Sequence, residues 1–213
     1  METINSLTDL FKKFPGIGPR QARRFVYYLL SANQNFLNQL GDKIKNLKKD
    51  IKQCAHCGRF FNNDYQLTAD KCKICADDER DKSSLLIIEK DIDLDAIEKA
   101  RIYRGYYFVL GGNAPILNPE PENHLRFSAL LTEIEYRLKE GLVEIIIALS
   151  ATTEGDHTAD WLIEKLRPLT APPAGRAGKT GLKISLLGRG LSTGSELEYA
   201  DPETIKNALS NRR

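Results

Sequence analysis

The sequence lacks any long hydrophobic run. Its longest apolar stretches, residues 85–88 and 145–149, are far shorter than the roughly 18 residues of a membrane span, so no transmembrane segment is predicted. A basic segment followed by an apolar one is also missing near residue 1, so neither a secretory signal nor a transit peptide is expected. With 41% hydrophobic and 28% charged residues, the composition is typical of a soluble globular protein with one large or two to three small domains, and we expect a cytoplasmic location.

Cysteine is scarce, and its spacing is informative. The four cysteines form two pairs, Cys54 with Cys57 and Cys72 with Cys75, and fourteen residues separate the pairs. In a reducing compartment, such close pairs favour metal ligands over disulfides. Four thiolates complete a tetrahedral shell and leave no position for water, so the sequence predicts one structural zinc ion.

Two other interpretations of this segment carry less weight. A redox-active pair would need to stand alone at the head of a helix in a thioredoxin-like fold. His56 lies inside the first pair, but four thiolates already fill the shell. We therefore interpret His56 as a bystander.

Net charge is also small, at +2, until the chain is divided. Residues 1–53 hold ten Lys or Arg against four Asp or Glu, a net charge of +6, and the remainder carries −4. A polyanion is therefore expected to bind the N-terminal quarter.

Apolar residues at helical spacing predict two helices around a short break in this basic segment. They are Leu7, Leu10, Phe11 and Phe14 before the break, and Ala22, Phe25, Val26 and Leu29 after it. The break reads Phe-Pro-Gly-Ile-Gly-Pro-Arg at residues 14–20. Pro15 disfavours helix at Phe14, the glycines permit unusual backbone angles, and Pro19 suits the first turn of a new helix. This pattern resembles the helix-hairpin-helix family of DNA-binding elements.

A helix that begins in this way can offer unpaired N–H groups and its positive dipole end to a phosphate. Arginines in the first turns flank that position, and such contacts hold the DNA backbone without reading its sequence. The candidate DNA-binding residues are Arg20, Arg24, Arg23, Lys12, Lys13, Gly16 and Gly18. The alternative is an ordinary turn between packed helices with a solvated charged face.

A third helix is predicted over residues 35–53, with apolar residues near one face and lysines largely on the other. It could pack against a core or face DNA.

The second half of the chain alternates apolar runs of strand length with helical stretches. The predicted strands are residues 85–88, 106–110, 142–149 and 182–187, and the predicted helices are 95–102, 122–139 and 158–166. This order favours a parallel sheet covered on both faces, whose ligands lie at the carboxyl ends of the strands. Glu89 follows the first strand, and residues 150–159 follow the third.

Glu89 and the turn Glu154-Gly155-Asp156 resemble the acidic positions of the Toprim domain of topoisomerases and primases. In that resemblance, two aspartates that hold magnesium fall on Ser150 and Thr152, which are neutral. Because a hard divalent cation prefers carboxylates, magnesium binding is not expected, and neither is catalysis. The alternative is a Toprim-type metal-dependent enzyme that cleaves or reseals DNA, using a displaced site of Glu89, Glu154 and Asp156.

The order of these parts resembles the RecR family of recombination mediators. Two further matches are Tyr-Arg-Gly-Tyr-Tyr-Phe-Val-Leu-Gly-Gly at residues 103–112 and Gly-Leu-Ser-Thr-Gly-Ser-Glu-Leu-Glu-Tyr-Ala-Asp at 190–201. The resemblance implies an α+β multidomain fold: a helix-hairpin-helix region over residues 1–53, a four-cysteine zinc finger over 54–75, a Toprim domain over 83–190, and a C-terminal segment over 191–213 used in assembly.

The same resemblance implies a function. RecR-like proteins are non-enzymatic, form a ring-shaped tetramer that encircles DNA, and act with RecO or RecF to place RecA on single-stranded gaps. DNA, single- or double-stranded, would contact Arg20 and Arg24, and Glu89, Glu154 and Asp156 would form an acidic face for RecO. An ordinary solvated rim is the alternative for these acids. Residues 171–181 contain Gly178-Lys179-Thr180, which resembles the end of a P-loop, but they precede a strand, and we interpret them as a surface loop.

Overall fold

The computed structural model describes residues 2–63, 70–116, 122, 124–170, 181–188, 197–200 and 202–210. The loop expected at 171–181 falls outside the described residues except for its last position, and so does most of the motif at 190–201. The chain forms two compact units, Met1–Ile51 and Lys52–Arg213, and each is described by itself.

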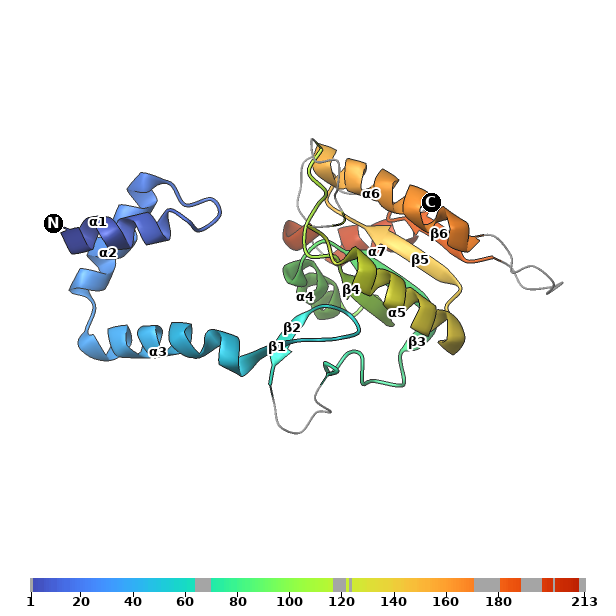
Figure 1. The fold of residues 1–213 in the computed structure, drawn as a ribbon, viewed down its shortest axis with the longest axis horizontal. Helices are drawn as coiled ribbons and strands as arrows, with labels where there is room; N and C mark the ends of the chain where they lie inside the picture. The colour runs from blue at the N-terminus through green and yellow to red at the C-terminus, as the bar shows by residue number, and fades with distance from the viewer. Residues whose placement is uncertain are drawn as a thin grey trace. The chain divides into compact units, whose positions relative to one another are not determined.

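Three helices make up the first unit: α1 (Glu2–Phe11), α2 (Pro19–Ser31) and α3 (Gln34–Asp50) (Figure 1). Helices α1 and α2 pack together through Phe11 and Phe25, whose ring centroids lie 5.6 Å apart, and Ala22 and Val26 are buried. The side chain of Asn33 caps α3 by accepting a hydrogen bond from the amide of Phe36 at 2.8 Å. The helix predicted to run to residue 53 ends at Asp50, because residues 51–53 enter a strand.

A small two-stranded sheet follows, made of β1 (Ile51–Gln53) and β2 (Phe60–Asn62). The main sheet contains β3 (Asp81–Ile88), β4 (Gly105–Val109), β5 (Glu144–Ala148) and β6 (Lys183–Leu186) in the order β4-β3-β5-β6. All of its neighbouring strands run parallel, with Leu86 opposite Tyr107 on one side and Ile146 on the other. The expected parallel sheet is confirmed.

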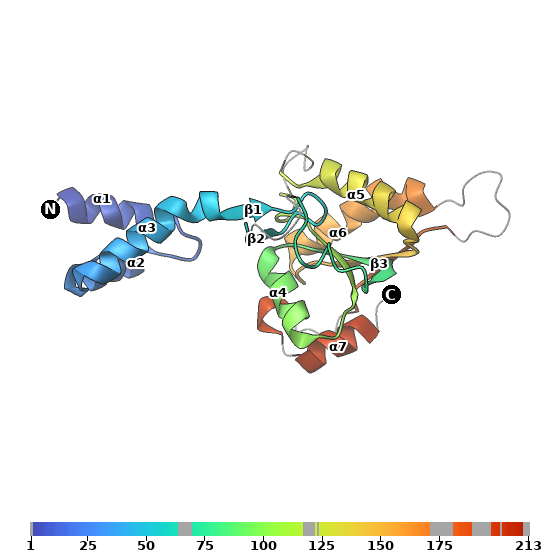
Figure 2. The same cartoon turned by 90° about the horizontal axis from the view of Figure 1, so that it is seen from below.

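Helices cover both faces of this sheet (Figure 2). Helices α5 (Phe127–Glu140) and α6 (Thr153–Leu166) lie on one face, and α4 (Asp91–Ala100) and α7 (Pro202–Ser210) lie on the other. Alternation along β3 decides which core each residue enters: Leu85 and Ile87 face α5 and α6, whereas Leu86 and Ile88 face α4 and α7. Short 3-10 helices, η2 (Arg167–Thr170) and η3 (Leu197–Tyr199), complete the unit.

The starts of the three central helices differ from the predicted ones. Helix α4 begins at Asp91 instead of 95, because the Asp93 carboxylate accepts from the Lys90 amide at 2.8 Å. Helix α5 begins at Phe127, five residues later than predicted. Helix α6 begins at Thr153, so Glu154, Gly155 and Asp156 form its first turn and not a loop. None of the helices in the described residues is long and apolar enough to cross a membrane.

Candidate functional sites: a hairpin, four cysteines and an acidic strand end

The hairpin between α1 and α2 is set by its prolines and glycines. The amide of Ile17 donates to the carbonyl of Phe14 at 3.2 Å, and Gly16 between them has a φ of +74°. Pro15 followed by a residue with positive φ is the signature of a type II turn. Gly18 then begins α2 with extended backbone and no side-chain cap, and Pro19 occupies the first turn. The N–H groups of that turn are therefore left for water or an anion.

A groove of about 720 Å³ lies beside this hairpin. Its lining residues come from the region of α1 and from α2: Asn5, Thr8, Asp9, Lys12, Pro19, Arg20, Arg23, Arg24 and Tyr27. Asp9 is the acid in this lining, and it pairs with Lys12 at 2.9 Å. The three arginines are exposed, so the groove presents an excess of positive charge. Lys13 is exposed as well but does not line the groove.

The four cysteines converge in the second unit. Their sulfur atoms all lie within 4.8 Å of one another, and all four side chains are buried and free of disulfides. The Sγ atoms of Cys57 and Cys72 are 3.6 Å apart. A tetrahedral ion with metal–sulfur bonds of about 2.3 Å would separate its ligands by roughly 3.8 Å. The cysteines are therefore positioned to bind one metal ion.

The charges of these thiols are strongly linked. Hydrogen bonds from the neighbouring thiols, first that of Cys57, lower the pKa of Cys54, whereas the bond with Cys54 and burial raise the pKa of Cys57. Four thiolates this close need a cation among them. Gly58, with a φ of +72°, makes the tight turn after the first pair, and a Cβ there would meet the Val109 carbonyl at 3.0 Å.

The cysteine segment packs against the sheet domain as part of one core. Strand β4 is an edge of the sheet, and the amide of Val109 at its end donates to the Cys57 carbonyl at 2.8 Å. Arg126 Nη1 donates to the carbonyls of Gly58 at 2.7 Å and Val109 at 3.1 Å. The cysteines share a buried cluster with Leu86, Ile88 and other residues of that face.

His56 is not a bystander in packing, although the sulfur cluster does not include it. Its Nδ1 lies 2.8 Å from Oε2 of Glu133 on α5, and its ring lies 5.1 Å from that of Tyr136. Glu133 also accepts from Nε of Arg137 at 2.6 Å. Burial raises the pKa of Glu133, although Arg137 and His56 oppose that shift. The contact between His56 and Glu133 was not predicted from the sequence, because 77 residues separate the two.

At the carboxyl end of β3, the structure brings together part of the predicted acidic site. The Glu89 carboxylate accepts from the Ser150 hydroxyl at 2.5 Å and pairs with Lys90 Nζ at 2.8 Å. Burial alone would raise the pKa of Glu89, but Lys90 and Ser150 together hold it below its ordinary value. Glu89 is 4% exposed, so it lies beneath the surface.

Glu154 and Asp156 are exposed in the first turn of α6, where the helix dipole favours acids. Thr152 caps this helix, since its Oγ1 accepts from the Gly155 amide at 3.1 Å. A cavity of about 230 Å³ between the strand ends and α6 is lined by Ser150, Asp156 and Asp160, among others. Among the described residues, the only group of three or more side chains arranged to hold a metal is the cysteine cluster.

Together, these features define a multidomain α+β protein that joins a basic hairpin unit to a metal-binding cysteine cluster and a parallel α/β domain. Residues 4–48 match the family described as RecR, helix-hairpin-helix; residues 83–173 match the Toprim domain; and residues 190–213 match RecR, C-terminal.

Full-length relatives give the same result. The "Recombination protein RecR" of Bifidobacterium longum subsp. infantis is 37% identical, over 99% of this chain and 95% of its own length. Proteins of the same name from Mycobacterium leprae and Dehalococcoides mccartyi are 34% and 35% identical, over 99% of this chain and 96% and 93% of their own lengths. The chain belongs to the RecR family, which supports a role in DNA recombination and repair.

Proposed function

We propose that this protein is a non-enzymatic recombination mediator that binds single- and double-stranded DNA without reading its sequence. It acts with RecO, RecF or both to help load RecA on single-stranded gaps. The observation that carries the DNA-binding part is the groove beside the hairpin, which Arg20, Arg23 and Arg24 line together with Pro19 at the uncapped start of α2. Cations and open N–H groups in this arrangement suit a phosphate.

Replacing Arg20 and Arg24 with alanine tests this assignment. Removing two phosphate contacts should weaken binding to unrelated DNA sequences alike and reduce the slope of log K against log salt by about two for duplex DNA. A matched control is the pair Lys48 and Lys49 in the last turn of α3, which lies outside the groove lining. Their replacement removes the same charge from the same unit. Equal losses in both double variants would show diffuse attraction and overturn the hairpin assignment.

The metal of the four cysteines is proposed to be one structural zinc ion. Four thiolate ligands suit zinc, and a complete shell supplies folding free energy and no catalysis. The purified protein should contain about one zinc per chain, and Cys72→Ser should lower this content and destabilise the second unit. An iron–sulfur absorption spectrum, or no bound metal at all, would contradict this proposal.

Partner binding and assembly are part of the same proposal. Exposed Glu154 and Asp156 would contribute to an acidic face for RecO, with Glu89 supporting it from below. Reversing both exposed charges to lysine should abolish capture of RecO while leaving DNA binding intact. Capture at the parent level would show that these acids form an ordinary solvated rim.

A homotetrameric ring is proposed from the resemblance to the RecR family, and the apolar surface of the first unit supports assembly. Ile44 and Leu47 of α3 are 64% and 58% exposed, and none of the α3 residues is buried. Such a face is stabilised when another copy covers it. Light scattering with and without DNA tests this state. We also propose that the protein is cytoplasmic and that its domains span residues 1–53, 54–75, 83–190 and 191–213.

A further inference from the structure

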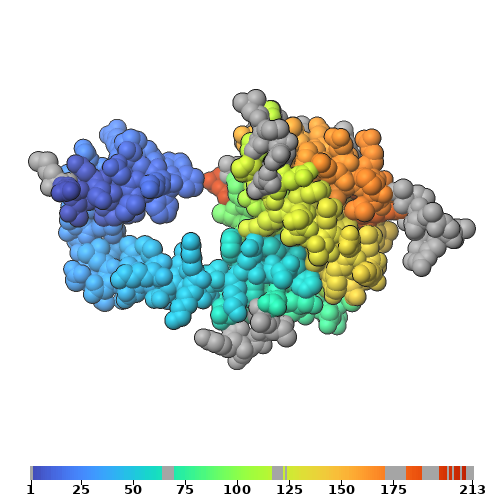
Figure 3. All heavy atoms as spheres, viewed as in Figure 1, coloured from blue at the N-terminus to red at the C-terminus, as the bar shows by residue number. Residues whose placement is uncertain are grey.

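A buried ion pair lies next to the cysteine cluster. Arg137 and Glu133 stand one turn apart on α5, their atoms Nε and Oε1 are 2.6 Å apart, and each residue is 4% exposed. The guanidinium of Arg137 lies 3.4 Å over the Tyr106 ring. In the space-filling view, the segment that carries Cys54 and Cys57 and helix α5 form one continuous surface (Figure 3).

Stability alone is a weak reason for this pair. Taking two charges out of water usually costs as much as their attraction returns, and apolar residues of similar size often serve a core as well or better. The neighbouring residues of α5, Leu130 and Ile134, show that apolar packing is available in this helix. The position of the pair therefore calls for an electrostatic explanation.

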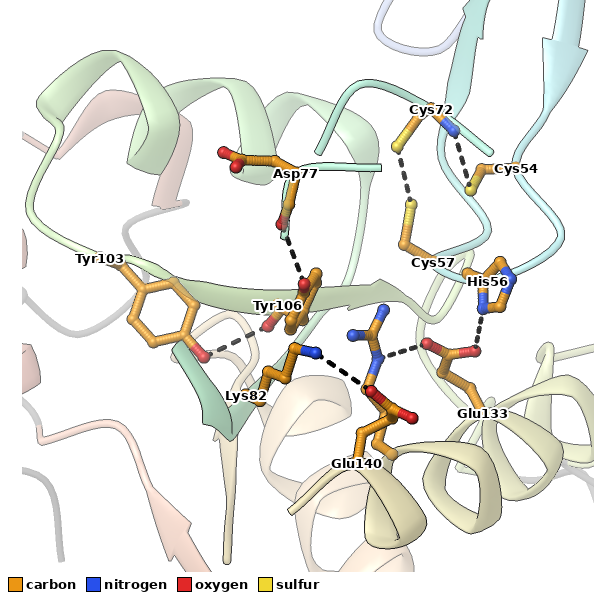
Figure 4. Close-up of polar contacts among 11 residues, drawn as sticks. Cys54, His56, Cys57, Cys72, Asp77, Lys82, Tyr103, Tyr106, Glu133 and Glu140 are labelled. Carbon is orange, nitrogen blue, oxygen red and sulfur yellow. Dashed lines mark hydrogen bonds and ion pairs between the residues drawn. The ribbon is translucent and has the colours of Figure 1, made fainter. Parts of the chain in front are cut away.

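The cysteines provide one. Four thiolates around a divalent ion carry a net charge of −2, and all four are buried, so a nearby cation would offset this charge. The pKa of Arg137 is raised above its ordinary value, because the negative charge of Glu133, and after it that of Cys75, outweighs burial. On its other side, Glu133 contacts His56, which lies between the ligands Cys54 and Cys57 (Figure 4). These contacts thus connect Arg137 on α5, through Glu133, with the residue between the first pair of cysteines.

We propose that Arg137 is the counter-charge of the metal centre and controls how firmly the four cysteines hold their ion, with Glu133 and His56 orienting it. This inference rests on the proposed zinc site. It assigns to α5 of the Toprim domain a direct part in metal retention. Groups that support metal ligands in this way commonly change metal affinity by about 10- to 100-fold.

Charge and simple packing predict different results for two variants. Arg137→Gln and Glu133→Gln both break the same ion pair, so a purely structural role makes both release zinc faster. If Arg137 acts through its charge, Arg137→Gln increases the negative charge around the thiolates, whereas Glu133→Gln decreases it. The first should then release zinc about tenfold faster, and the second no faster than the parent, because the amide oxygen of a glutamine can still accept the hydrogen bond that orients Arg137.

The experiment measures zinc release from the full-length protein into excess chelator with a colorimetric zinc indicator at pH 8. Arg137→Lys, which keeps the charge, should restore most of the retention lost in Arg137→Gln. Lys82→Gln is the matched control, because it removes a cation that pairs with α5 through Glu140 at 3.1 Å on the surface. Its release rate should equal that of the parent.

Each outcome separates the two proposals. A parent without bound metal contradicts the zinc site itself. A parent that holds one zinc, with Glu133→Gln releasing it as fast as Arg137→Gln, shows a structural latch and overturns the counter-charge. Unchanged release in both variants overturns it too. If Arg137→Gln fails to fold, the Glu133→Gln and Arg137→Lys rates still decide, because faster release from Glu133→Gln or a tenfold loss in Arg137→Lys contradicts the proposal.

Discussion

The hydroxyl of Ser150 donates a hydrogen bond of 2.5 Å to Oε2 of Glu89, joining the carboxyl ends of β5 and β3. Lys90 contacts the other oxygen of the same carboxylate at 2.8 Å. The buried negative charge is thus held by a neutral donor and an ammonium group. Ser150 and Thr152, the neutral residues that set this site apart from the acidic Toprim pattern, therefore have structural roles: Ser150 stabilises the buried charge of Glu89, and Thr152 caps α6.

Ser150→Ala should destabilise the second unit by about 1–3 kcal/mol at pH 7, because a buried carboxylate oxygen loses its donor. The pKa of Glu89 is lowered in the folded protein, so its ionised form stabilises the fold above its ordinary pKa. This contribution disappears as pH falls through the folded value. The difference between variant and parent should therefore shrink below about pH 4.

Urea unfolding checks this prediction. Trp161, the single tryptophan, lies in α6, so its fluorescence reports on the second unit. Ser83→Ala is the control, because its hydroxyl also donates to a carboxylate, that of Asp81 at 2.6 Å, but in an exposed position. It should change stability by no more than about 0.5 kcal/mol. An equal loss in both variants would contradict the importance of the buried bond.

Asp93→Asn should stabilise the protein at pH 7. Burial, followed by repulsion from Glu89 and others, raises the pKa of Asp93 to about 6, although the Lys90 amide opposes this shift. An ionised Asp93 therefore costs stability above pH 6, and this penalty vanishes as pH falls toward its ordinary pKa. Asparagine can still accept from the Lys90 amide, so the cap of α4 is retained.

The expected gain is on the order of 1–3 kcal/mol at pH 7, declining between about pH 6 and pH 4. Thermal unfolding of both proteins across this range measures it. A gain that is independent of pH would contradict the electrostatic cause. A loss at pH 7 would show that the ionised cap outweighs its burial.

Gly155→Ala should destabilise the second unit by about 1–3 kcal/mol, because the new Cβ would overlap the backbone carbonyl of Ser150. Gly41 in α3 is the control, since a Cβ there meets nothing within 4 Å. Gly41→Ala should instead stabilise its helix by about 0.5–1 kcal/mol. Urea unfolding followed by Trp161 fluorescence and by circular dichroism distinguishes the two units. If Gly155→Ala left the stability of the second unit unchanged, α6 would be able to shift away from Ser150.

The sequence was sufficient for features with strong local signals. Apolar runs such as residues 145–149 predicted the strands, the paired cysteines predicted a metal site, and the glycines and prolines of residues 14–20 predicted the hairpin. Each signal depends on neighbouring residues alone. The order of strands and the burial of Glu89 depend on packing between distant segments, and sequence pattern did not show that Glu89 is covered.

One error and one omission have particular physical causes. Residues 154–156 were interpreted as a turn because Gly155 is a typical turn residue. In the structure Thr152 caps α6, so the helix begins at Thr153 and includes Gly155. The contact between His56 and Glu133 joins two distant segments. The spacing of Glu133 and Arg137, four residues apart on a helix, was the available signal for the ion pair, but it did not indicate burial.

Gly18→Asp should raise stability and weaken DNA binding at the same time. Gly18 begins α2 without a side-chain cap, and a Cβ there meets nothing within 4 Å. An aspartate in this position can accept hydrogen bonds from the first-turn N–H groups, and its negative charge interacts favourably with the helix dipole. These effects should stabilise the first unit by a few tenths of a kcal/mol or more. The same carboxylate would occupy the position proposed for a DNA phosphate and would repel the negative charge of that phosphate.

We therefore expect Gly18→Asp to bind DNA at least about tenfold more weakly, with a salt slope reduced by about one. Gly18→Ala, which adds a Cβ without charge, is the matched control and should bind close to the parent level. Fluorescence anisotropy with labelled single- and double-stranded DNA at several salt concentrations measures both effects. Because the aspartate variant is expected to be more stable, unfolding cannot explain its weaker binding. Tight binding by Gly18→Asp would place the phosphate elsewhere, and the three arginines would then act without the helix end.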